Sequence, residues 1–221
     1  MAMTDLPIVL VHGWGFGPEI WDPIRRASPD RDWRPLDFGY FSAIPHVELP
    51  DRPFMAVGHS LGTLWLLSEM PERCRGMMLL NGFARFAASD DFPQGVSPRI
   101  LTRMIHRLEG APDATVRDFR HKAGTDMPVP GPPQHARLLD GLRMLRRLDA
   151  RQAARSMPCP IYCSAGTHDT IAPPALTQAS FAPATPIDWQ EGGHLLPLTH
   201  PDACLAMIDR MMERISRDLL A

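Results

Sequence analysis

The sequence has few cysteines and no long apolar segment. Four cysteines are scattered along the chain without the close pairs that hold a metal ion, and they favour packing roles over a disulfide framework. No apolar stretch approaches the ~20 residues of a membrane-spanning helix, and the N-terminus lacks a basic region followed by an apolar core. We therefore expect a cytoplasmic protein with no membrane span, no bound metal and no cofactor.

The chain as a whole also lacks an excess of one charge. Its 221 residues include 23 Lys or Arg and 25 Asp or Glu, and 44% are hydrophobic, which is typical of one globular domain. Residues 97–155 nevertheless contain twelve basic and six acidic residues, so the remainder has eight more acidic than basic residues. This polarity suits the steering of an anionic partner, and it equally fits the solvated faces of amphipathic helices. No nucleic-acid-binding motif is present, so we expect no nucleic-acid partner.

A serine motif follows the short apolar run of residues 54–57. Its sequence is Gly58-His59-Ser60-Leu61-Gly62, and a helix-like segment comes next. A G-x-S-x-G motif between a strand and a helix is the nucleophile elbow of serine hydrolases, in which the glycines permit a strained turn. The motif alone is also compatible with an ordinary turn. Ser60 becomes the candidate nucleophile if an acid and a base accompany it.

Two side chains further along the chain supply that acid and base. The apolar run 161–163 leads into a loop with Asp169, and the last predicted strand leads into a glycine-containing loop with His194. The order Ser, Asp, His is that of the α/β-hydrolases. A serine hydroxyl needs an imidazole to take its proton, and the carboxylate orients the imidazole. Three other residues compete for these roles. Asp188 is interpreted as a solvated residue on a strand face, His168 as a structural residue, and His200 as a capping or surface residue.

The predicted oxyanion hole uses backbone N–H groups from two places. Residues 7–11 form a short apolar strand that ends at His12-Gly13-Trp14-Gly15. In α/β-hydrolases one donor comes from such a loop, and the other comes from the residue after the nucleophile. We predict Trp14 and Leu61 as these donors.

The order of elements predicts an α/β-hydrolase fold, with a mostly parallel sheet and helices on both of its faces. Strands are expected at about 8–11, 34–38, 54–57, 76–80, 160–164 and 185–189, and helices at 61–69 and 201–219. Residues 39–53 contain three prolines and no helical period, so no helix is expected there.

Residues 84–154, called the insertion below, interrupt this core. We expect residues 1–83 and 155–221 to form the hydrolase core and the insertion to form a helical lid after the sixth core strand. Its helices are expected at about 98–108, 114–123 and 136–148, with a proline-rich connector at 127–133.

Several segments together resemble one enzyme family. They are residues 11–15 (VHGWG) with Trp21, residues 60–62, residues 86–93 (FAASDDFP), residues 141–145 (GLRML) with 148–149, and residues 193–201 (GHLLPLTHP). The sequence is similar to the pimeloyl-[acyl-carrier protein] methyl ester esterases of biotin synthesis, within the α/β-hydrolase superfamily. The resemblance departs at His59, where the family commonly has tryptophan, and at Ala114 and Asp118, where it has arginines.

The resemblance implies a monomeric serine carboxylesterase that removes the methyl group from a pimeloyl chain on acyl-carrier protein. It implies substrate contacts at Trp14, Ser60, Leu61, Phe119, Arg120, His121, Lys122, Ala123 and His194. Arg117, Arg137 and Arg143 are candidates for contact with the acidic carrier. Three alternatives are a general short-chain carboxylesterase, an acyl thioesterase and a non-enzymatic binding protein of the same fold.

Overall fold

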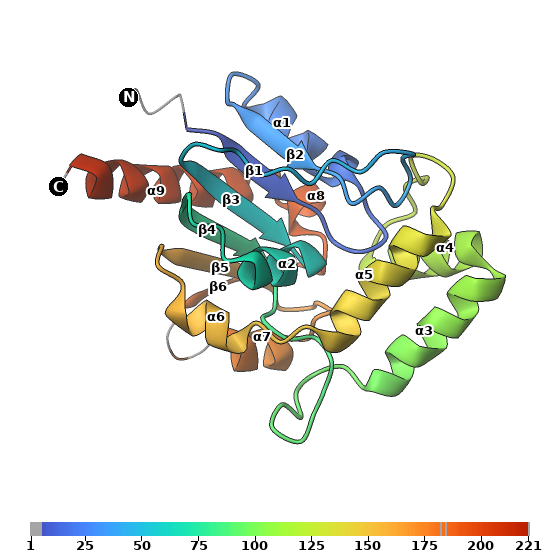
Figure 1. Ribbon diagram of the computed structural model, residues 1–221. Helices are drawn as coiled ribbons and strands as arrows, with labels where there is room; N and C mark the ends of the chain where they lie inside the picture. Colours follow the sequence, from blue (N-terminus) through green and yellow to red (C-terminus); the bar gives the residue numbers. More distant parts are fainter. Residues whose placement is uncertain (1–5, 182, 184, 221) are drawn as a thin grey trace.

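The computed structural model describes residues 6–181, 183 and 185–220. Its centre is a sheet of six parallel strands in the order β2-β1-β3-β4-β5-β6 (Figure 1). The strands are β1 (Ile8–Val11), β2 (Trp33–Leu36), β3 (Phe54–His59), β4 (Cys74–Leu80), β5 (Ile161–Gly166) and β6 (Ile187–Gln190). Four strands lie inside the sheet, and three of them, β1, β3 and β4, are almost wholly buried, as the continuous apolar runs of a covered parallel sheet require.

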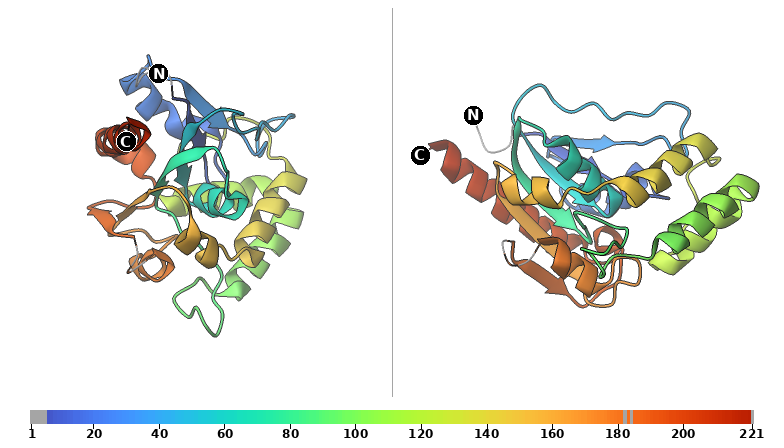
Figure 2. Two further views of the ribbon diagram at one scale, coloured as in Figure 1. Left: turned by 60° about the vertical axis from the view of Figure 1, so that its left-hand side comes forward. Right: turned by 60° about the horizontal axis from the view of Figure 1, so that its bottom comes forward.

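Helices cover both faces of the sheet. The long C-terminal helix α9 (Pro201–Leu220) packs on β4 beside α1 (Asp22–Ala27), and α2 (Leu61–Glu69) packs on β3 from the opposite face (Figure 2). The remaining core helices are η2 (Pro18–Trp21), α7 (Pro174–Phe181) and α8 (Leu196–Thr199). None of the described helices has the length and apolar character needed to cross a bilayer.

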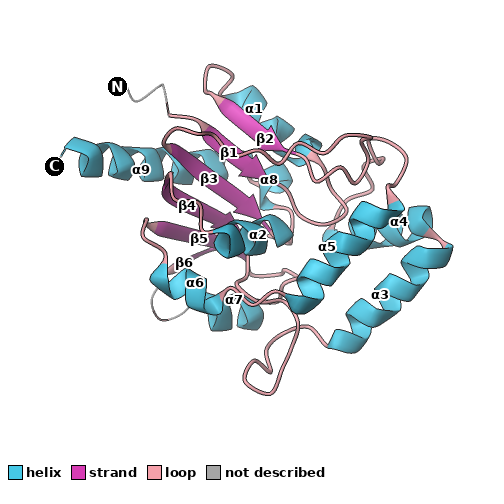
Figure 3. Cartoon of the chain, viewed as in Figure 1, coloured by secondary structure: helices cyan, strands magenta, loops and turns pink. Residues whose placement is uncertain are grey.

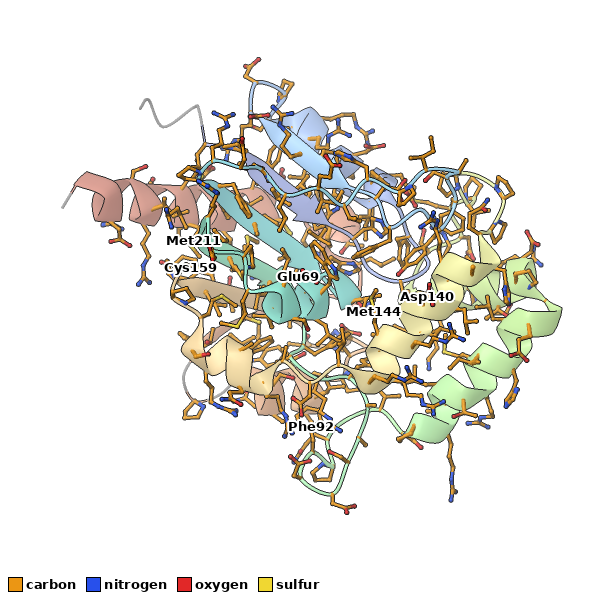
Figure 4. The ribbon with its side chains drawn as sticks, in the orientation of Figure 1. Glu69, Phe92, Asp140, Met144, Cys159 and Met211 are labelled. Atoms are coloured by element: carbon orange, nitrogen blue, oxygen red, sulfur yellow. The ribbon has the colours of Figure 1, made fainter. Side chains whose placement is uncertain are left out.

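Most of the insertion lies beyond the carboxyl ends of the strands, and its last residues return alongside the sheet toward the start of β5 (Figures 1 and 3). After a loop that contains Phe92, labelled in Figure 4, the chain forms α3 (Pro98–Gly110), α4 (Pro112–Ala123), α5 (His135–Arg147) and α6 (Arg151–Ser156). The two ends of the insertion meet, because the Ala150 N–H donates to the Ala84 carbonyl at 2.7 Å. Helix α5 also packs against α2 of the core.

The expected fold class is confirmed, and most elements begin and end within two residues of their predicted bounds. No helix lies between β2 and β3, as the three prolines of residues 39–53 indicated. Five short helices were not predicted, since each has eight residues or fewer and shows little periodicity: η2, α1, α6, α7 and α8. The insertion was expected after the sixth core strand. Among the described residues, four strands (β1 to β4) precede it, and β5 and β6 follow it.

Candidate active site

Ser60 stands at a strained turn between β3 and α2. Its backbone angles are φ 54° and ψ −121°, a conformation that residues other than glycine rarely adopt. The neighbouring glycines are required by close packing. A Cβ at Gly62 would lie 2.1 Å from the Val11 carbonyl oxygen, and one at Gly58 would lie 2.8 Å from the Thr63 backbone nitrogen. The turn therefore presents the Ser60 hydroxyl at the carboxyl end of the sheet.

Three side chains from separate loops form a continuous hydrogen-bond chain. The Ser60 Oγ lies 3.0 Å from His194 Nε2, and His194 Nδ1 lies 2.7 Å from Asp169 Oδ2. The Nδ1–H donates to the carboxylate, which leaves Nε2 free to accept the serine proton. This is the geometry that a Ser–His–Asp nucleophile requires. The structure thus brings together the three residues that the sequence singled out.

The Asp169 carboxylate is held by backbone groups on its other oxygen. The N–H groups of Ile171 and Ala172 both donate to Asp169 Oδ1 at 2.8 Å. Burial raises the pKa of Asp169, whereas the adjacent His194 ring and these two N–H groups lower it. The lowering effects together are larger, so the pKa of Asp169 is below its ordinary value. Asp169 is therefore charged at neutral pH and suited to stabilise an imidazolium.

His59 lies beside His194 and is fully buried. Its Nε2–H donates to the His194 backbone carbonyl at 2.8 Å, while Nδ1 has no hydrogen-bond partner among the described residues. Burial and the neighbouring His194 lower the pKa of His59 to about 3. His59 is consequently neutral throughout the physiological pH range and supports the loop that carries His194.

The two predicted oxyanion donors flank the serine. A Cβ at Gly13 would lie 2.9 Å from the Ser60 Cβ, so the backbone just before Trp14 passes directly over the nucleophile. Leu61 is the first residue of α2, and its N–H has no partner within the helix. The Trp14 ring is anchored to the insertion, because its Nε1–H donates to the Leu138 carbonyl at 2.8 Å. Both donors therefore belong to firmly packed backbone.

The part of the chain that the structure describes contains no group of three or more His, Cys, Asp or Glu side chains placed to hold a metal ion. The cysteines are free thiols: Cys74, Cys159, Cys163 and Cys204.

Comparison with known proteins places this chain in a family. A model of the alpha/beta hydrolase family matches residues 8–207. The pimeloyl-[acyl-carrier protein] methyl ester esterase of Klebsiella pneumoniae subsp. pneumoniae is 30% identical over 76% of this chain and 77% of its own length. The protein of the same name from Legionella pneumophila (strain Lens) is 25% identical over 94% of this chain and 95% of its own length. The chain belongs to the α/β-hydrolase family, in its pimeloyl-[acyl-carrier protein] methyl ester esterase branch.

Solved α/β-hydrolase structures share this fold. An esterase from Exiguobacterium antarcticum superposes with a TM-score of 0.79 at 13% identity, covering 95% of this chain and 92% of its own. At this identity the match concerns the fold alone.

In this α/β hydrolase the insertion residues expected at the substrate lie in different environments. The half-buried Phe119 ring packs edge-on against Trp14, with their ring centres 4.8 Å apart. Ala123 is buried, whereas His121 and Lys122 are exposed. His121 Nδ1 lies 2.8 Å from the Asp126 carboxylate, away from Ser60. Phe119 thus contacts the Trp14 ring of the oxyanion loop.

Arg120 is buried, with 2% of its surface exposed. Its guanidinium donates to the Gly15 carbonyl at 3.0 Å and to the Glu19 carboxylate at 3.1 Å, and it lies 4.6 Å from the centre of the Phe16 ring. Its second terminal nitrogen donates to the Pro128 carbonyl at 3.4 Å. Arg120 therefore ties α4 of the insertion to the loop that follows Trp14.

The arginines expected at the carrier are more accessible. Arg117 on α4 and Arg143 on α5 are exposed, and Arg143 pairs with Asp140 of its own helix at 3.0 Å. Asp140 and Met144, labelled in Figure 4, mark the same helix. Arg137 is half-buried, and its side chain packs close to Gly39.

The competing residues lie elsewhere in this hydrolase. Asp188 and His168 are exposed, and His200 is half-buried beside the Thr199 hydroxyl. Sequence reasoning missed Asn81, which follows β4 and donates to Asp169 Oδ2 at 2.9 Å. The available signal was weak: it is the single asparagine of the chain and comes directly after a strand.

Access to the candidate site is narrow in this structure. Ser60 is 5% exposed, His194 2% and Trp14 1%. The ring of Phe119 and the helix α5 contact Trp14 from the side of the insertion. Ser60 is therefore almost wholly buried in this structure.

Proposed function

We propose that the protein is a cytoplasmic serine carboxylesterase that hydrolyses the methyl ester of pimeloyl-[acyl-carrier protein] in biotin synthesis. The products are pimeloyl-[acyl-carrier protein] and methanol. The observation that carries this proposal is the Ser60–His194–Asp169 chain, with distances of 3.0 Å and 2.7 Å, in a sequence related to esterases of that name. We further propose that the insertion acts as the lid of this site.

The proposed reaction proceeds in two steps. Ser60 Oγ attacks the ester carbonyl while His194 Nε2 takes its proton, and the imidazolium is stabilised by Asp169. The tetrahedral intermediate collapses when His194 returns that proton to the departing methanol, which leaves an acyl-serine. Water then attacks the acyl-serine with His194 again as base, and the free carboxylate and Ser60 are released.

The negative oxygen of each tetrahedral intermediate needs preorganised donors. The N–H groups of Trp14 and Leu61 are proposed to supply them, one from the loop after β1 and one from the start of α2. Each such donor is worth roughly 3 kcal/mol in the transition state. Because both are backbone groups of buried residues, they need little reorganisation during the reaction.

The charge of residues 97–155, nearly all of which belong to the insertion, supports a carrier-linked substrate. Residues 97–155 contain twelve basic and six acidic residues, and acyl-carrier proteins are acidic. Arg117 on α4 and Arg143 on α5 are both exposed, so they can attract an anionic partner. We propose that the carrier approaches this side of the molecule and that the acyl chain passes beneath the insertion to Ser60.

The test is mass spectrometry of the methyl ester of pimeloyl-[acyl-carrier protein] after incubation with the enzyme, with Ser60→Ala as the control. We expect the wild type to remove one CH₂ mass from an intact conjugate and the variant to leave it unchanged. Loss of the whole acyl chain would show a thioesterase instead. An untouched conjugate, together with rapid hydrolysis of short free esters, would show a general carboxylesterase.

A further inference from the structure

Asn81 occupies the first position after β4, at its carboxyl end. Strand β4 lies between β3 and β5 in the sheet (Figure 1). It is fully buried, and its backbone has φ 47°, in the left-handed region. The backbone N–H donates to the Ser164 carbonyl of β5 at 2.8 Å. Asparagine accepts this conformation more readily than most side chains, yet it still costs energy. The position is therefore one where the local backbone is held by its surroundings.

All three polar contacts of the Asn81 side chain go to the loops that carry the acid and the base. Its Nδ2 donates to Asp169 Oδ2 at 2.9 Å and to the Gly193 carbonyl at 3.0 Å. Its Oδ1 accepts the Leu196 N–H at 3.4 Å. The amide orientation follows from these partners, because the carboxylate and the carbonyl can only accept and the backbone N–H can only donate.

The two loop contacts lie on either side of His194. Gly193 immediately precedes it and Leu196 follows two residues later, so one amide group spans the segment that carries the base. The same Nδ2 reaches the Asp169 oxygen that accepts the His194 proton. One side chain thus fixes both partners of the acid–base pair relative to each other.

We propose that Asn81 is a positioning residue that aligns Asp169 and His194 for proton transfer from Ser60. The inference rests on the proposed triad and adds a residue to it. Only an amide meets every demand at this position. Aspartate tolerates the backbone conformation but has no N–H to donate, glycine tolerates it without any side chain, and a serine hydroxyl has a single proton for two acceptors.

The charged and titratable groups that face His194 define the expected pH behaviour. Asp169 contacts it from the loop after β5, and His59 and Ser60 face it from the end of β3. An aspartate at position 81 would add a second carboxylate beside Asp169. A second negative charge at this place favours the protonated form of the acid–base pair, so the acid limb of kcat/KM is expected to move to higher pH.

The first test uses the fact that Asn81 is the only asparagine of the chain. Protein labelled with ¹⁵N-asparagine gives one pair of side-chain amide proton signals by NMR. We expect this pair to shift with pH at the same midpoint as the acid limb of kcat/KM, and to lose that shift in His194→Ala. A pair that does not respond to pH while activity titrates would overturn the proposal.

The second test compares Asn81→Asp and Asn81→Gly with the wild type on a short free ester. Both replacements tolerate a left-handed backbone. We expect each to lower kcat about tenfold or more with KM changed less than threefold. Only Asn81→Asp should move the acid limb of kcat/KM to higher pH. Unchanged kcat in both variants would overturn the proposal, as would a loss that follows the folded fraction by circular dichroism while the acid limb stays in place.

The short ester separates this inference from the proposed substrate. If the wild type hydrolyses it but not the carrier-linked ester, the carrier proposal fails while the role of Asn81 is still tested. If Ser60→Ala retains the activity of the wild type, the triad fails, and the role of Asn81 fails with it.

Discussion

At the scale of single residues, the candidate site is built from buried histidines around a strained serine. His12, His59 and His194 are all at most 2% exposed, and their ring nitrogens make different hydrogen bonds. His12 Nε2 accepts the Phe38 N–H at 3.1 Å, which leaves Nδ1 to donate toward the Gly13 carbonyl at 2.9 Å. His59 donates to a carbonyl of the His194 loop, while only His194 reaches the serine hydroxyl.

The depressed pKa of His59 predicts a loss of stability in mild acid. Its pKa is about 3 in the folded state against about 6.5 when unfolded. Between these values the unfolded chain binds a proton that the folded chain does not, so stability falls as the pH falls through 6.5. From pH 7 to pH 5 we expect this residue to remove about 2 kcal/mol of the free energy of unfolding.

Urea unfolding at pH 7 and pH 5 measures this effect. His59→Gln is the matched variant, because glutamine keeps an N–H donor for the His194 carbonyl but does not titrate. The wild type should lose about 2 kcal/mol more than the variant over this pH interval. Equal losses in the two proteins would mean that His59 is protonated in the folded state.

At the scale of elements, the loops that follow five of the strands converge at the carboxyl end of the sheet, where open parallel sheets place their sites. These strands are β1, β3, β4, β5 and β6. The sequence predicted three of these loops as carriers of the serine, acid and base, because each shows a local pattern of apolar strand followed by glycine. The fold class followed from the order of strands and helices. These features are local, and they can be read from neighbouring residues.

The role of Asn81 and the buried position of Arg120 could not be predicted in the same way. The role of Asn81 depends on the meeting of segments at positions 81, 169 and 193–196, which are separated by up to half the chain. Arg120 sits in an amphipathic helix whose other basic residues face solvent, and nothing in its spacing marks it as buried. Such roles arise from tertiary contacts, and a single sequence carries no local signal for them.

The Arg120 contacts predict that α4 is firmly attached to the core. Removing one partner of a buried ion pair leaves the other without compensation and costs about 3 kcal/mol or more. Arg120→Leu should therefore loosen α4 and the loop 15–19, and lower kcat/KM through the displaced Trp14. Hydrogen exchange followed by mass spectrometry should show faster exchange in both segments.

Arg117→Leu is the matched control for this prediction. Arg117 lies on the same helix and is exposed, whereas Arg120 is buried. We expect the control to exchange like the wild type in α4 and in residues 15–19. Wild-type exchange in Arg120→Leu would contradict the idea that this ion pair holds the insertion to the core.

At the scale of the whole molecule, charge is distributed unevenly between the insertion and the core. The insertion region is basic, and the remaining chain is acidic, although the net charge is only −2. Such a distribution orients an approaching acidic protein more than it changes the strength of the final contact. Its effect depends on ionic strength, because exposed charges are screened over about 8 Å at physiological salt.

This polarity predicts different salt responses for two substrates. The kcat/KM for the carrier-linked ester should fall as the salt concentration rises from about 50 to 500 mM, while that for a short uncharged ester should change little. Stopped-flow or steady-state assays with both substrates measure the difference. Parallel curves would show that the basic insertion does not guide the carrier.

The depth of Ser60 has a consequence for where hydrolysis stops. The proposed substrate has two reactive carbonyls, a thioester beside the carrier and a methyl ester at the far end of the chain. A folded carrier cannot follow its acyl group under the insertion, so only the far carbonyl comes within reach of a serine that is 5% exposed. The insertion would then select the reacting carbonyl by its distance from the carrier. The enzyme would remove the methyl group once and leave intact the thioester that links the acyl chain to the carrier.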